Sequence, residues 1–309
     1  MLIQAVDSPD MAEGATAFLE KRRPAFPRPD EPRAARRGAE PPRGTIMTSL
    51  DGKRMLITGA GRGMGREIAV EAARQGAEFV AVADIDAAAA EEAAAAVEAA
   101  GAKARPIETD LSDSAQVRRM VELAVAGAGG LDTLVNNAGV LDHTIQEGAT
   151  YETLTEEAWD KVYAVNVKAV WLAAKYAAPH LKASDRGPSV VNASSVAGLT
   201  GYGLPAYTSS KGAVIQLTRS LAVSLAPEVR CNAYCPGSIE TPMSQAHLAA
   251  AEDREATLRS MTGAHLIPRF GTTGEIAKAV CFLASDAASF ITGVALPVDG
   301  GTMAWRGLR

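Results

Sequence analysis

Short apolar runs alternate with longer mixed stretches along most of this chain. Runs of three to five mainly apolar residues, each bounded by turn residues, predict buried strands. The stretches between them predict helices, the first two at residues 66–75 and 87–100. The predicted strands are residues 55–58, 79–83, 133–135, 189–192 and 230–234. Strands that alternate with helices in this way predict an α/β fold, a doubly wound parallel sheet with helices on both faces.

The first 46 residues follow a different pattern. Prolines and charged residues of both signs dominate residues 21–43, and apolar residues are scarce there. A segment of this composition buries too little apolar surface to offset the entropy cost of ordering it. We therefore expect residues 1–46 to be a disordered tail and residues 47–309 to form a single folded domain.

One part of this tail resembles a known segment. Residues 8–26 are similar to the C-terminal tail of enoyl-CoA hydratase-like proteins, and Met47 is a natural start for the domain that follows. Our hypothesis is that residues 1–46 are a mis-called start or the remnant of an upstream gene's end. The alternative is a real flexible extension of the chain.

Overall charge and cysteine content narrow the range of partners. The chain of 309 residues has 31 Lys and Arg against 36 Asp and Glu, a formal net charge of −5. This balance argues against nucleic acid, whose binding needs a basic surface, and no apolar run reaches the roughly 20 residues of a membrane span. Three cysteines are too few for a disulfide framework and indicate a reducing compartment, so we expect a cytoplasmic protein. The four histidines are scattered, and we expect no metal site.

A glycine-rich turn follows the first predicted strand. Residues 58–65 read TGAGRGMG, in which Gly59, Gly63 and Gly65 let the backbone turn tightly. Backbone without side chains can approach a pyrophosphate closely, and the helix that follows offers its N-terminal amides to the anion. Because the turn lies between a strand and a helix, it predicts a dinucleotide site.

Two residues near this turn bear on which dinucleotide binds. Asp84 ends the second strand, where a carboxylate accepts hydrogen bonds from the adenosine ribose and repels a 2′-phosphate, so it favours NAD(H). Arg62 lies inside the turn, and its guanidinium can pair with that phosphate, so it favours NADP(H). We give Asp84 precedence. Its alternative role is an ordinary helix cap before Ala87.

Further candidate site residues follow the next strands. Asp110 is placed to meet the adenine edge, and residues 136–139, NNAG, have the short side chains that suit close contact with a ribose. Tyr207 and Lys211 are four residues apart, so a helix brings them to one face. An ammonium beside a phenol lowers the phenol's pKa, and with a positive nicotinamide ring nearby this makes Tyr207 a general acid or base. The alternative is a surface pair on an amphipathic helix.

The order of these motifs resembles the short-chain dehydrogenase/reductase family. The motifs are TGxxxGxG at residues 58–65, NNAG at residues 136–139, Asn166, Ser195, YxxxK at residues 207–211 and Pro-Gly at residues 236–237. The resemblance covers about residues 50–303. It implies one Rossmann-like catalytic domain with about seven parallel strands, hydride transfer between a nicotinamide cofactor and a small-molecule alcohol or ketone, and a homodimer or homotetramer.

The resemblance also implies roles for these residues. Tyr207 is the catalytic acid or base, Lys211 lowers its pKa and holds the nicotinamide ribose, and Ser195 binds the substrate oxygen. Asn166 positions a water that links Lys211 to solvent. The implied cofactor contacts, of which Ile239 and Thr241 reach the carboxamide, are Gly59, Arg62, Gly63, Met64, Gly65, Asp84, Asp110, Leu111, Asn137, Ala138, Gly139, Tyr207, Lys211, Pro236, Gly237, Ile239 and Thr241.

Two features depart from the family's pattern. The serine commonly stands 13 residues before the tyrosine, whereas Ser195 stands 12 before Tyr207 and Ser194 has the common spacing. Since Ser195 and the residues after it match the motif better, we assign the catalytic role to Ser195 with a one-residue loop deletion. Residues 141–159 form a longer stretch than is usual in the family, at the rim of the substrate pocket that the resemblance implies.

Together these observations predict an NAD-dependent oxidoreductase that interconverts a secondary alcohol and a ketone. We expect residues 243–268 to form a movable lid, whose apolar residues suit a hydrophobic or alicyclic alcohol that is steroid-, terpenoid- or hydroxyacyl-like. The main alternative is an NADPH-dependent 3-oxoacyl thioester reductase, supported by Arg62. An alternative of another class is a catalytically idle dinucleotide-binding scaffold, although every catalytic position is filled.

Overall fold

The computed structural model describes residues 20, 49–251, 253–263 and 265–304. The chain divides into two units, Met1–Thr45 and Ile46–Arg309, and the second contains all the helices and strands described below. Apart from Glu20, the predicted tail lies outside the described residues, and so does the rest of the segment that resembles a hydratase tail.

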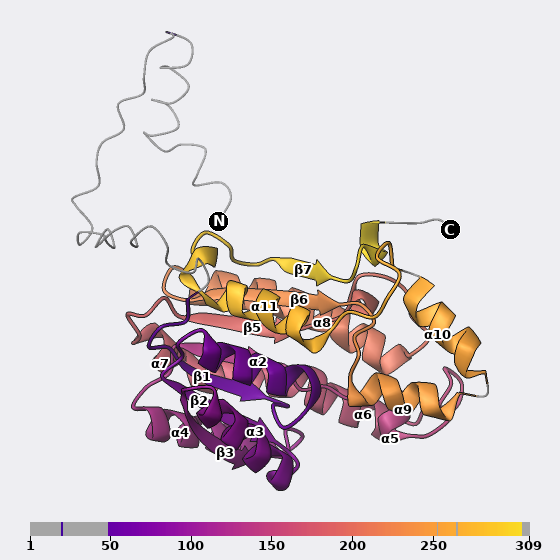
Figure 1. Cartoon of the computed structure of the whole chain (residues 1–309), viewed down its shortest axis with the longest axis horizontal. Helices are drawn as coiled ribbons and strands as arrows, with labels where there is room; N and C mark the ends of the chain where they lie inside the picture. Colours follow the sequence, from indigo (N-terminus) through magenta and orange to yellow (C-terminus); the bar gives the residue numbers. More distant parts are fainter. Residues whose placement is uncertain (1–19, 21–48, 252, 264, 305–309) are drawn as a thin grey trace. The chain divides into compact units, whose positions relative to one another are not determined.

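Seven parallel strands form one sheet in the order β3-β2-β1-β4-β5-β6-β7, which confirms the predicted doubly wound fold (Figure 1). The order turns back between β1 and β4, and ligands of such sheets bind at this switch point, beyond the carboxyl ends of the strands. The strands are β1 Arg54–Thr58, β2 Phe79–Asp84, β3 Lys103–Glu108, β4 Thr133–Asn136, β5 Ser189–Ala193, β6 Arg230–Pro236 and β7 Ala295–Val298.

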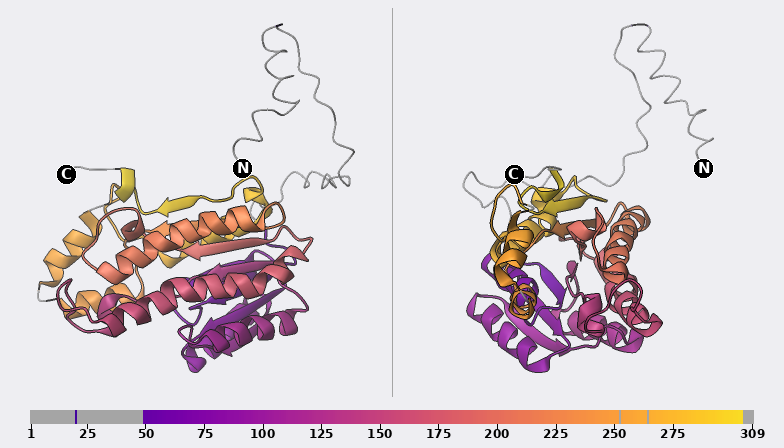
Figure 2. Two further views of the ribbon diagram at one scale, coloured as in Figure 1. Left: turned by 180° about the vertical axis from the view of Figure 1, so that it is seen from behind. Right: turned by 90° about the vertical axis from the view of Figure 1, so that its right-hand side faces the viewer.

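Helices cover both faces of the sheet (Figure 2). One layer contains α2 (Gly63–Arg74), α3 (Ala87–Ala99) and α11 (Thr273–Ala284), and the other contains α4 (Ser114–Ala128), α7 (Ala169–Lys182) and α8 (Pro205–Leu225). Near the carboxyl ends of the strands lie α5 (Asp142–Ile145), α6 (Glu156–Tyr163), α9 (Pro242–Ala250) and α10 (Arg254–Gly263) (Figure 1). Short turns complete the fold: η1 Ala164–Lys168, η2 Val196–Gly198, η3 Asp286–Ala288 and η4 Thr302–Ala304.

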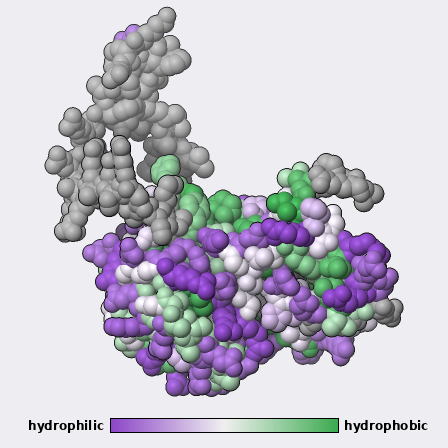
Figure 3. Space-filling model, viewed as in Figure 1, coloured by the Kyte–Doolittle hydropathy of each residue, from purple (hydrophilic) through white to green (hydrophobic). Residues whose placement is uncertain are grey.

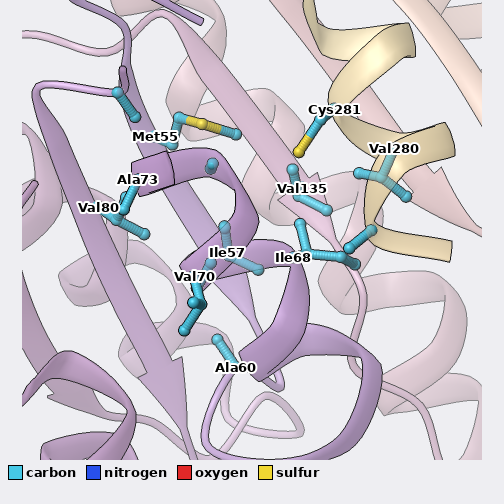
Figure 4. Close-up of a cluster of buried hydrophobic side chains, with 14 of the residues drawn as sticks. Met55, Ile57, Ala60, Ile68, Val70, Ala73, Val80, Val135, Val280 and Cys281 are labelled. Atoms are coloured by element: carbon cyan, nitrogen blue, oxygen red, sulfur yellow. The ribbon is translucent and has the colours of Figure 1, made fainter. Parts of the chain in front are cut away.

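Alternate side chains of the strands build two separate cores. Met55 and Ile57 of β1 pack with Ile68 of α2 and Val280 of α11 (Figure 4), whereas Leu56 between them packs on the opposite side, against α4 and α7. Successive strand residues point to opposite faces of a sheet. A central parallel strand is therefore apolar at every position, which is why its short apolar run is easy to recognise in the sequence.

The two outer strands are the ones that the strand pattern does not predict. β3 has the sequence KARPIE and exposes about half its residues, and β7 is only four residues long with a proline inside it. Outer strands have one unpaired edge, so they tolerate charge and proline. Their sequences therefore lack the apolar run that marks the inner strands.

A buried ion pair ties β1 to the residue before β4 at the amino end of the sheet. Asp132 is fully buried, and its Oδ1 and Oδ2 accept hydrogen bonds from the Arg54 guanidinium at 2.6 and 2.8 Å. The Arg54 amide and the Ser184 hydroxyl donate to the same carboxylate at 2.8 and 2.5 Å. Burial alone would raise the pKa of Asp132, but these hydrogen bonds outweigh it and hold the pKa below its usual value.

Hydrophilic residues cover much of the surface over α2 and α3, as expected for a helix layer that turns its apolar side inward (Figure 3). Among the described residues, no helix combines the length and apolar character needed to cross a membrane.

Candidate active site

The glycine turn between β1 and α2 fits its predicted role as a cradle. Gly59 and Gly63 have φ angles of +61° and +57°, which side chains disfavour. At Gly65, a Cβ would lie 2.0 Å from the Gly59 carbonyl oxygen, so only glycine can occupy this position. No side chain caps the N-terminus of α2, and its first amides therefore point toward the turn without a side-chain acceptor. Met64 packs its side chain against the neighbouring core.

The turn is held by residues from distant strands. The amides of Asn137 and Ala138 donate to the Thr58 hydroxyl at 3.1 and 3.2 Å. The Asn137 side chain donates to the carbonyls of Thr58 and Gly59 at 3.1 and 3.0 Å and accepts from the hydroxyl of Tyr234, on β6, at 2.9 Å. The structure therefore commits the hydrogen bonds of the Asn137 side chain to the glycine turn and to Tyr234, and its contact with a cofactor ribose stays a prediction.

Two carboxylates stand beside the turn. Asp84 Oδ2 accepts from the Gly61 amide at 2.8 Å, and Asp84 is nine-tenths buried. Asp86 pairs with Arg62 through a short contact between its Oδ2 and the guanidinium. Asp86 also caps α3 by accepting from the Ala89 amide at 3.1 Å. The helix cap considered for Asp84 is therefore Asp86, and the sequence analysis did not foresee the partner of Arg62.

Asp110 lies in the loop after β3, close to β2. Its Oδ1 accepts from the amide and hydroxyl of Ser112 at 2.8 and 2.7 Å, and Lys161 lies 3.5 Å from Oδ2. The hydrogen bond from the Ser112 hydroxyl, more than any other contact, lowers the pKa of Asp110. The neighbouring Leu111 packs against the core on the α4 side. Both residues therefore shape the loop after β3, and their contact with an adenine stays a prediction.

Ser195, Tyr207 and Lys211 meet beyond the ends of β5 and β6. The Lys211 ammonium lies 5.6 Å from the centre of the Tyr207 ring and donates to the Ala193 carbonyl at 2.9 Å. The Ser195 hydroxyl interacts with the Tyr207 phenol. A Cβ on Gly139 would lie 3.1 Å from Lys211 Nζ, so the backbone after β4 passes directly over the ammonium. The helical spacing therefore brings tyrosine and lysine together as predicted, inside the protein and not on its surface.

Burial changes the protonation of both groups. It lowers the pKa of Lys211 to about 8. It raises the pKa of Tyr207, and the hydrogen bond with Ser195 opposes this rise only in part. In the protein alone, the pKa of Tyr207 is therefore raised and not lowered as expected from its neighbour Lys211, because burial disfavours the charged phenolate.

The two adjacent serines have different partners. The Ser194 hydroxyl donates to the Lys211 carbonyl at 2.8 Å within the interior. The Ser195 hydroxyl accepts from the Ala197 amide at 3.1 Å and faces the Tyr207 phenol. Ser194 thus supports the backbone of α8, and Ser195 is the serine that lies beside the Tyr207 phenol.

Asn166 lies in the π-helical turn η1 between α6 and α7. Its Oδ1 accepts from the Val140 amide at 2.9 Å, and its Nδ2 donates to the Val140 carbonyl and to the Ser210 hydroxyl, both at 3.0 Å. A π-turn inserts an extra residue and often marks a functional position. The side chain of Asn166 therefore holds the segment after Gly139, and the water that it is predicted to position beside Lys211 stays a prediction.

The loop after β6 faces the glycine turn. A Cβ on Gly63 would lie 3.6 Å from Pro242 and 3.8 Å from Thr241, which caps α9. The buried His265 holds this loop from the other side: its Nε2 accepts from the Ser238 amide at 3.2 Å, and its Nδ1 lies 2.7 Å from the Arg269 carbonyl. His265 lies within the predicted lid, and no pattern in the sequence indicates these partners.

The remaining predicted residues of this loop are placed as follows. Pro236 is the last residue of β6, and the Gly237 amide donates to the Val298 carbonyl at 3.1 Å. A Cβ on Gly237 would lie 2.9 Å from the Asp299 Cα, so glycine is required for the close packing of these two loops. Ile239 is buried and pairs with Gly271.

Comparison with known proteins identifies this arrangement. A family model described as enoyl-(acyl carrier protein) reductase matches residues 59–303. The crystal structure of a short-chain type dehydrogenase/reductase from Mycobacterium marinum is 31% identical, covers 84% of this chain and 98% of its own, and superimposes with a TM-score of 0.75. The chain belongs to the short-chain dehydrogenase/reductase family.

Two relatives of this short-chain dehydrogenase/reductase have names that describe dehydrogenases of secondary alcohols. The 2-(R)-hydroxypropyl-CoM dehydrogenase of Xanthobacter autotrophicus is 38% identical over 248 residues, 79% of this chain and 96% of the relative. The cyclopentanol dehydrogenase of Comamonas sp. is 36% identical over 257 residues, 82% of this chain and 98% of the relative. The protein is thus an enzyme of the short-chain alcohol dehydrogenase and ketone reductase type, and the enzymes of this family use nicotinamide dinucleotides.

Proposed function

We propose that this enzyme is an NAD-dependent oxidoreductase that interconverts a secondary alcohol and a ketone, with Tyr207 as its acid and base. The observation that carries the proposal is the cluster of Ser195, Tyr207 and Lys211 beside the backbone of Gly139. These groups combine a hydroxyl donor, a proton carrier and a cation at one place, as oxidation of a secondary alcohol requires.

The chain contains the residues needed to hold the cofactor. The backbone cradle of Gly59, Gly63 and Gly65 fits a pyrophosphate, because a side chain at Gly65 would collide with the turn itself. Asp84 would accept from the adenosine ribose, and Lys211 would hold the nicotinamide ribose against Gly139. When bound, the oxidised nicotinamide ring supplies a hydride acceptor and a positive charge.

Side chains of the protein then carry out the proton transfer. The Ser195 hydroxyl donates to the substrate oxygen and fixes it next to the Tyr207 phenol. In alcohol oxidation the deprotonated Tyr207 takes the hydroxyl proton as the carbinol carbon loses its hydride, and in ketone reduction the protonated phenol returns it. Lys211 stabilises the phenolate by its positive charge, which joins that of the ring and opposes the effect of burial.

The acidic pair beside the glycine turn supports NAD over NADP. Asp84 is already nine-tenths buried against the turn, and a 2′-phosphate next to it would place two negative charges together. Arg62, the residue that supports the reductase alternative, is paired with Asp86. To bind a phosphate, Arg62 would have to leave a carboxylate that already neutralises it.

A titration of the purified protein with NADH and with NADPH, followed by the fluorescence of the bound nicotinamide, tests the cofactor choice. We expect NADH to bind at least about tenfold more tightly. Asp86→Ala releases Arg62, so we expect it to tighten NADPH binding about tenfold, the effect of one charge-assisted contact of about 1.4 kcal/mol. Glu91→Ala, which removes an exposed carboxylate of α3 further along the helix, is the control and should change neither affinity.

Tighter binding of NADPH by the unmodified protein would favour the thioester reductase. Binding of either cofactor without turnover of any alcohol or ketone would favour the idle scaffold.

For the substrate we propose a hydrophobic or alicyclic secondary alcohol, with a hydroxyacyl compound as the other member of this class. Exposed apolar side chains near the catalytic residues support this choice, namely Leu199 and Tyr202 before α8. The name of the cyclopentanol dehydrogenase also supports the alicyclic choice, and the name of the 2-(R)-hydroxypropyl-CoM dehydrogenase supports a secondary alcohol. A panel that compares cyclic, linear and charged secondary alcohols at saturating NAD should give the highest kcat/KM with the uncharged cyclic ones.

We further propose a homo-oligomer, a dimer or tetramer, in which α6 and α7 form a contact. Trp159 and Trp171 leave 37% and 44% of their surfaces exposed. Trp171 lines a groove together with Tyr163, Val167 and Leu217, and Trp159 stacks on Tyr163. Large exposed apolar patches of this kind mark interaction sites. Trp171→Glu should lower the particle mass measured by light scattering, whereas Lys103→Glu on the outer strand β3 should not. An unchanged mass for Trp171→Glu would exclude this face as the contact.

The state of the cysteines supports a cytoplasmic location. Cys231, Cys235 and Cys281 are buried and none of them forms a disulfide, and burial raises the pKa of each thiol. They are therefore inert packing residues, which a reducing compartment maintains.

A further inference from the structure

The helix that carries Tyr207 has no cap of its own. α8 begins at Pro205, and no side chain of the preceding residue, Leu204, accepts a hydrogen bond from it. The first amides of any helix lack partners within the helix. Pro205 has no amide hydrogen, and the Thr208 amide donates to the Leu204 carbonyl at 2.8 Å. The amides of Ala206 and Tyr207 therefore need an acceptor from elsewhere.

Asp142 supplies both acceptors from a segment 65 residues earlier in the chain. Its Oδ1 accepts from the Tyr207 amide at 2.7 Å, and its Oδ2 accepts from the Ala206 amide at 3.1 Å. Asp142 is fully buried. A buried carboxylate needs hydrogen bonds to compensate for its lost hydration, and the positive end of a helix favours a negative charge. The carboxylate and the start of α8 thus satisfy one another.

A second contact holds the other side of the same residue. The Ser210 hydroxyl donates to the Tyr207 carbonyl at 2.7 Å and accepts from Asn166 at 3.0 Å. Asn166 in turn holds Val140, two residues before Asp142. The amide and the carbonyl of Tyr207 are therefore both fixed by groups that belong to, or are bound to, the segment that follows Gly139.

We infer that Asp142 is a positioning residue that sets where the Tyr207 phenol stands relative to Ser195 and Lys211. The inference rests on the proposed function, because it concerns the acid and base of that reaction. Two acceptors on one rigid carboxylate fix both the position of the first turn of α8 along the helix axis and its rotation about that axis. A single acceptor cannot fix both. A catalytic group that moves by about 1 Å can lose about a hundredfold in rate.

Asp113 provides a matched control. It caps α4 locally, where its Oδ1 accepts from the amides of Ala115 and Gln116 at 2.8 and 3.5 Å. α4 carries none of the proposed catalytic residues. Loss of either carboxylate removes a helix cap, but only Asp142 caps the helix that bears Tyr207.

The kinetic test compares Asp142→Ala, Asp142→Asn and Asp113→Ala at saturating NAD, with kcat expressed per NADH-binding site. We expect kcat to fall about 10- to 100-fold in Asp142→Ala, with the Kd for NADH unchanged. Asp142→Asn keeps one acceptor, so its kcat should lie between those of Asp142→Ala and the unmodified protein. Asp113→Ala should lower the melting temperature but keep the kcat of the unmodified protein. A kcat within twofold of the unmodified protein in both Asp142 variants would overturn the inference, as would an equal loss in Asp113→Ala.

Amide hydrogen exchange measured by mass spectrometry tests the positioning without reference to turnover. In the cofactor-free protein, Asp142→Ala should speed exchange in peptides that cover residues 204–212 and leave those of α4 unchanged. Asp113→Ala should show the opposite pattern. If the unmodified protein oxidised no alcohol, the proposed function would fail. The exchange pattern would still show whether Asp142 fixes the first turn of α8. Unchanged exchange at residues 204–212 would show that it does not.

Discussion

Tyr207→Phe is expected to lose about 10²- to 10⁴-fold in kcat while binding NADH as tightly as the unmodified protein. The substitution removes only the phenolic oxygen, which is the atom that exchanges a proton with the substrate. The ring that lies 5.6 Å from the Lys211 ammonium remains, so the shape of the site is kept. Steady-state rates with NAD and a secondary alcohol, together with an NADH titration of the same sample, separate chemistry from cofactor binding.

The pH dependence gives this prediction a second readout. Alcohol oxidation needs the deprotonated phenol, so its rate should rise with pH through the pKa of Tyr207, and ketone reduction should fall over the same range. The Phe variant should lack both transitions. Tyr176→Phe, a tyrosine of α7 that packs against the core between the sheet and the layer of α4, α7 and α8, should behave like the unmodified protein. A Tyr207→Phe variant that kept more than a tenth of the turnover would contradict the assigned mechanism.

The second large effect concerns stability. Asp132→Ala leaves the Arg54 guanidinium, 15% exposed, without its buried partner, and breaking such a pair costs about 3–5 kcal/mol of unfolding free energy. For a domain of this size this corresponds to a melting temperature lower by on the order of 10 °C. Urea denaturation followed by circular dichroism measures the change. Glu78→Ala, which breaks the surface ion pair with Arg186, should change stability little.

The same pair makes stability depend on pH at the acid end. The pKa of Asp132 lies below its usual value in the folded protein. Its contribution is therefore fully present above the unfolded pKa of about 3.9 and is lost as the pH falls through the folded value. The difference in stability between the unmodified protein and Asp132→Ala should stay constant near neutral pH and shrink in acid. A constant difference down to about pH 2 would contradict this assignment.

The parts of the fold that the sequence predicts are those determined by local pattern. β1, β2, β4, β5 and β6 are buried on both faces, so each is a short apolar run. β3 and β7 lie at the edges of the sheet, where no such run is needed. The glycine turn is predictable for the same reason, because the local path of the backbone requires glycine at residues 59, 63 and 65.

The parts of the site that the sequence does not predict depend on contacts between distant residues. Tyr234 supports Asn137 from 97 residues further along, and Asp142 caps a helix 65 residues away. Neither residue belongs to a local motif. Asp86 is a nearer case: a carboxylate just before a helix is a recognisable cap, but its pairing with Arg62 depends on how the turn folds back. Protonation shows the same limit, since burial decides the pKa of Tyr207 and burial is a property of the whole fold.

The bond between Tyr234 and Asn137 has a consequence for how the protein matures during synthesis. The glycine turn is encoded near the start of the domain, yet the side chain that shapes it is fixed by a residue of β6. A growing chain on the ribosome cannot present a finished nucleotide cradle until β6 has emerged and joined the sheet. We therefore expect truncated or half-made chains to bind no cofactor, so that only completed molecules gain the added protection against unfolding and proteolysis that a bound ligand confers.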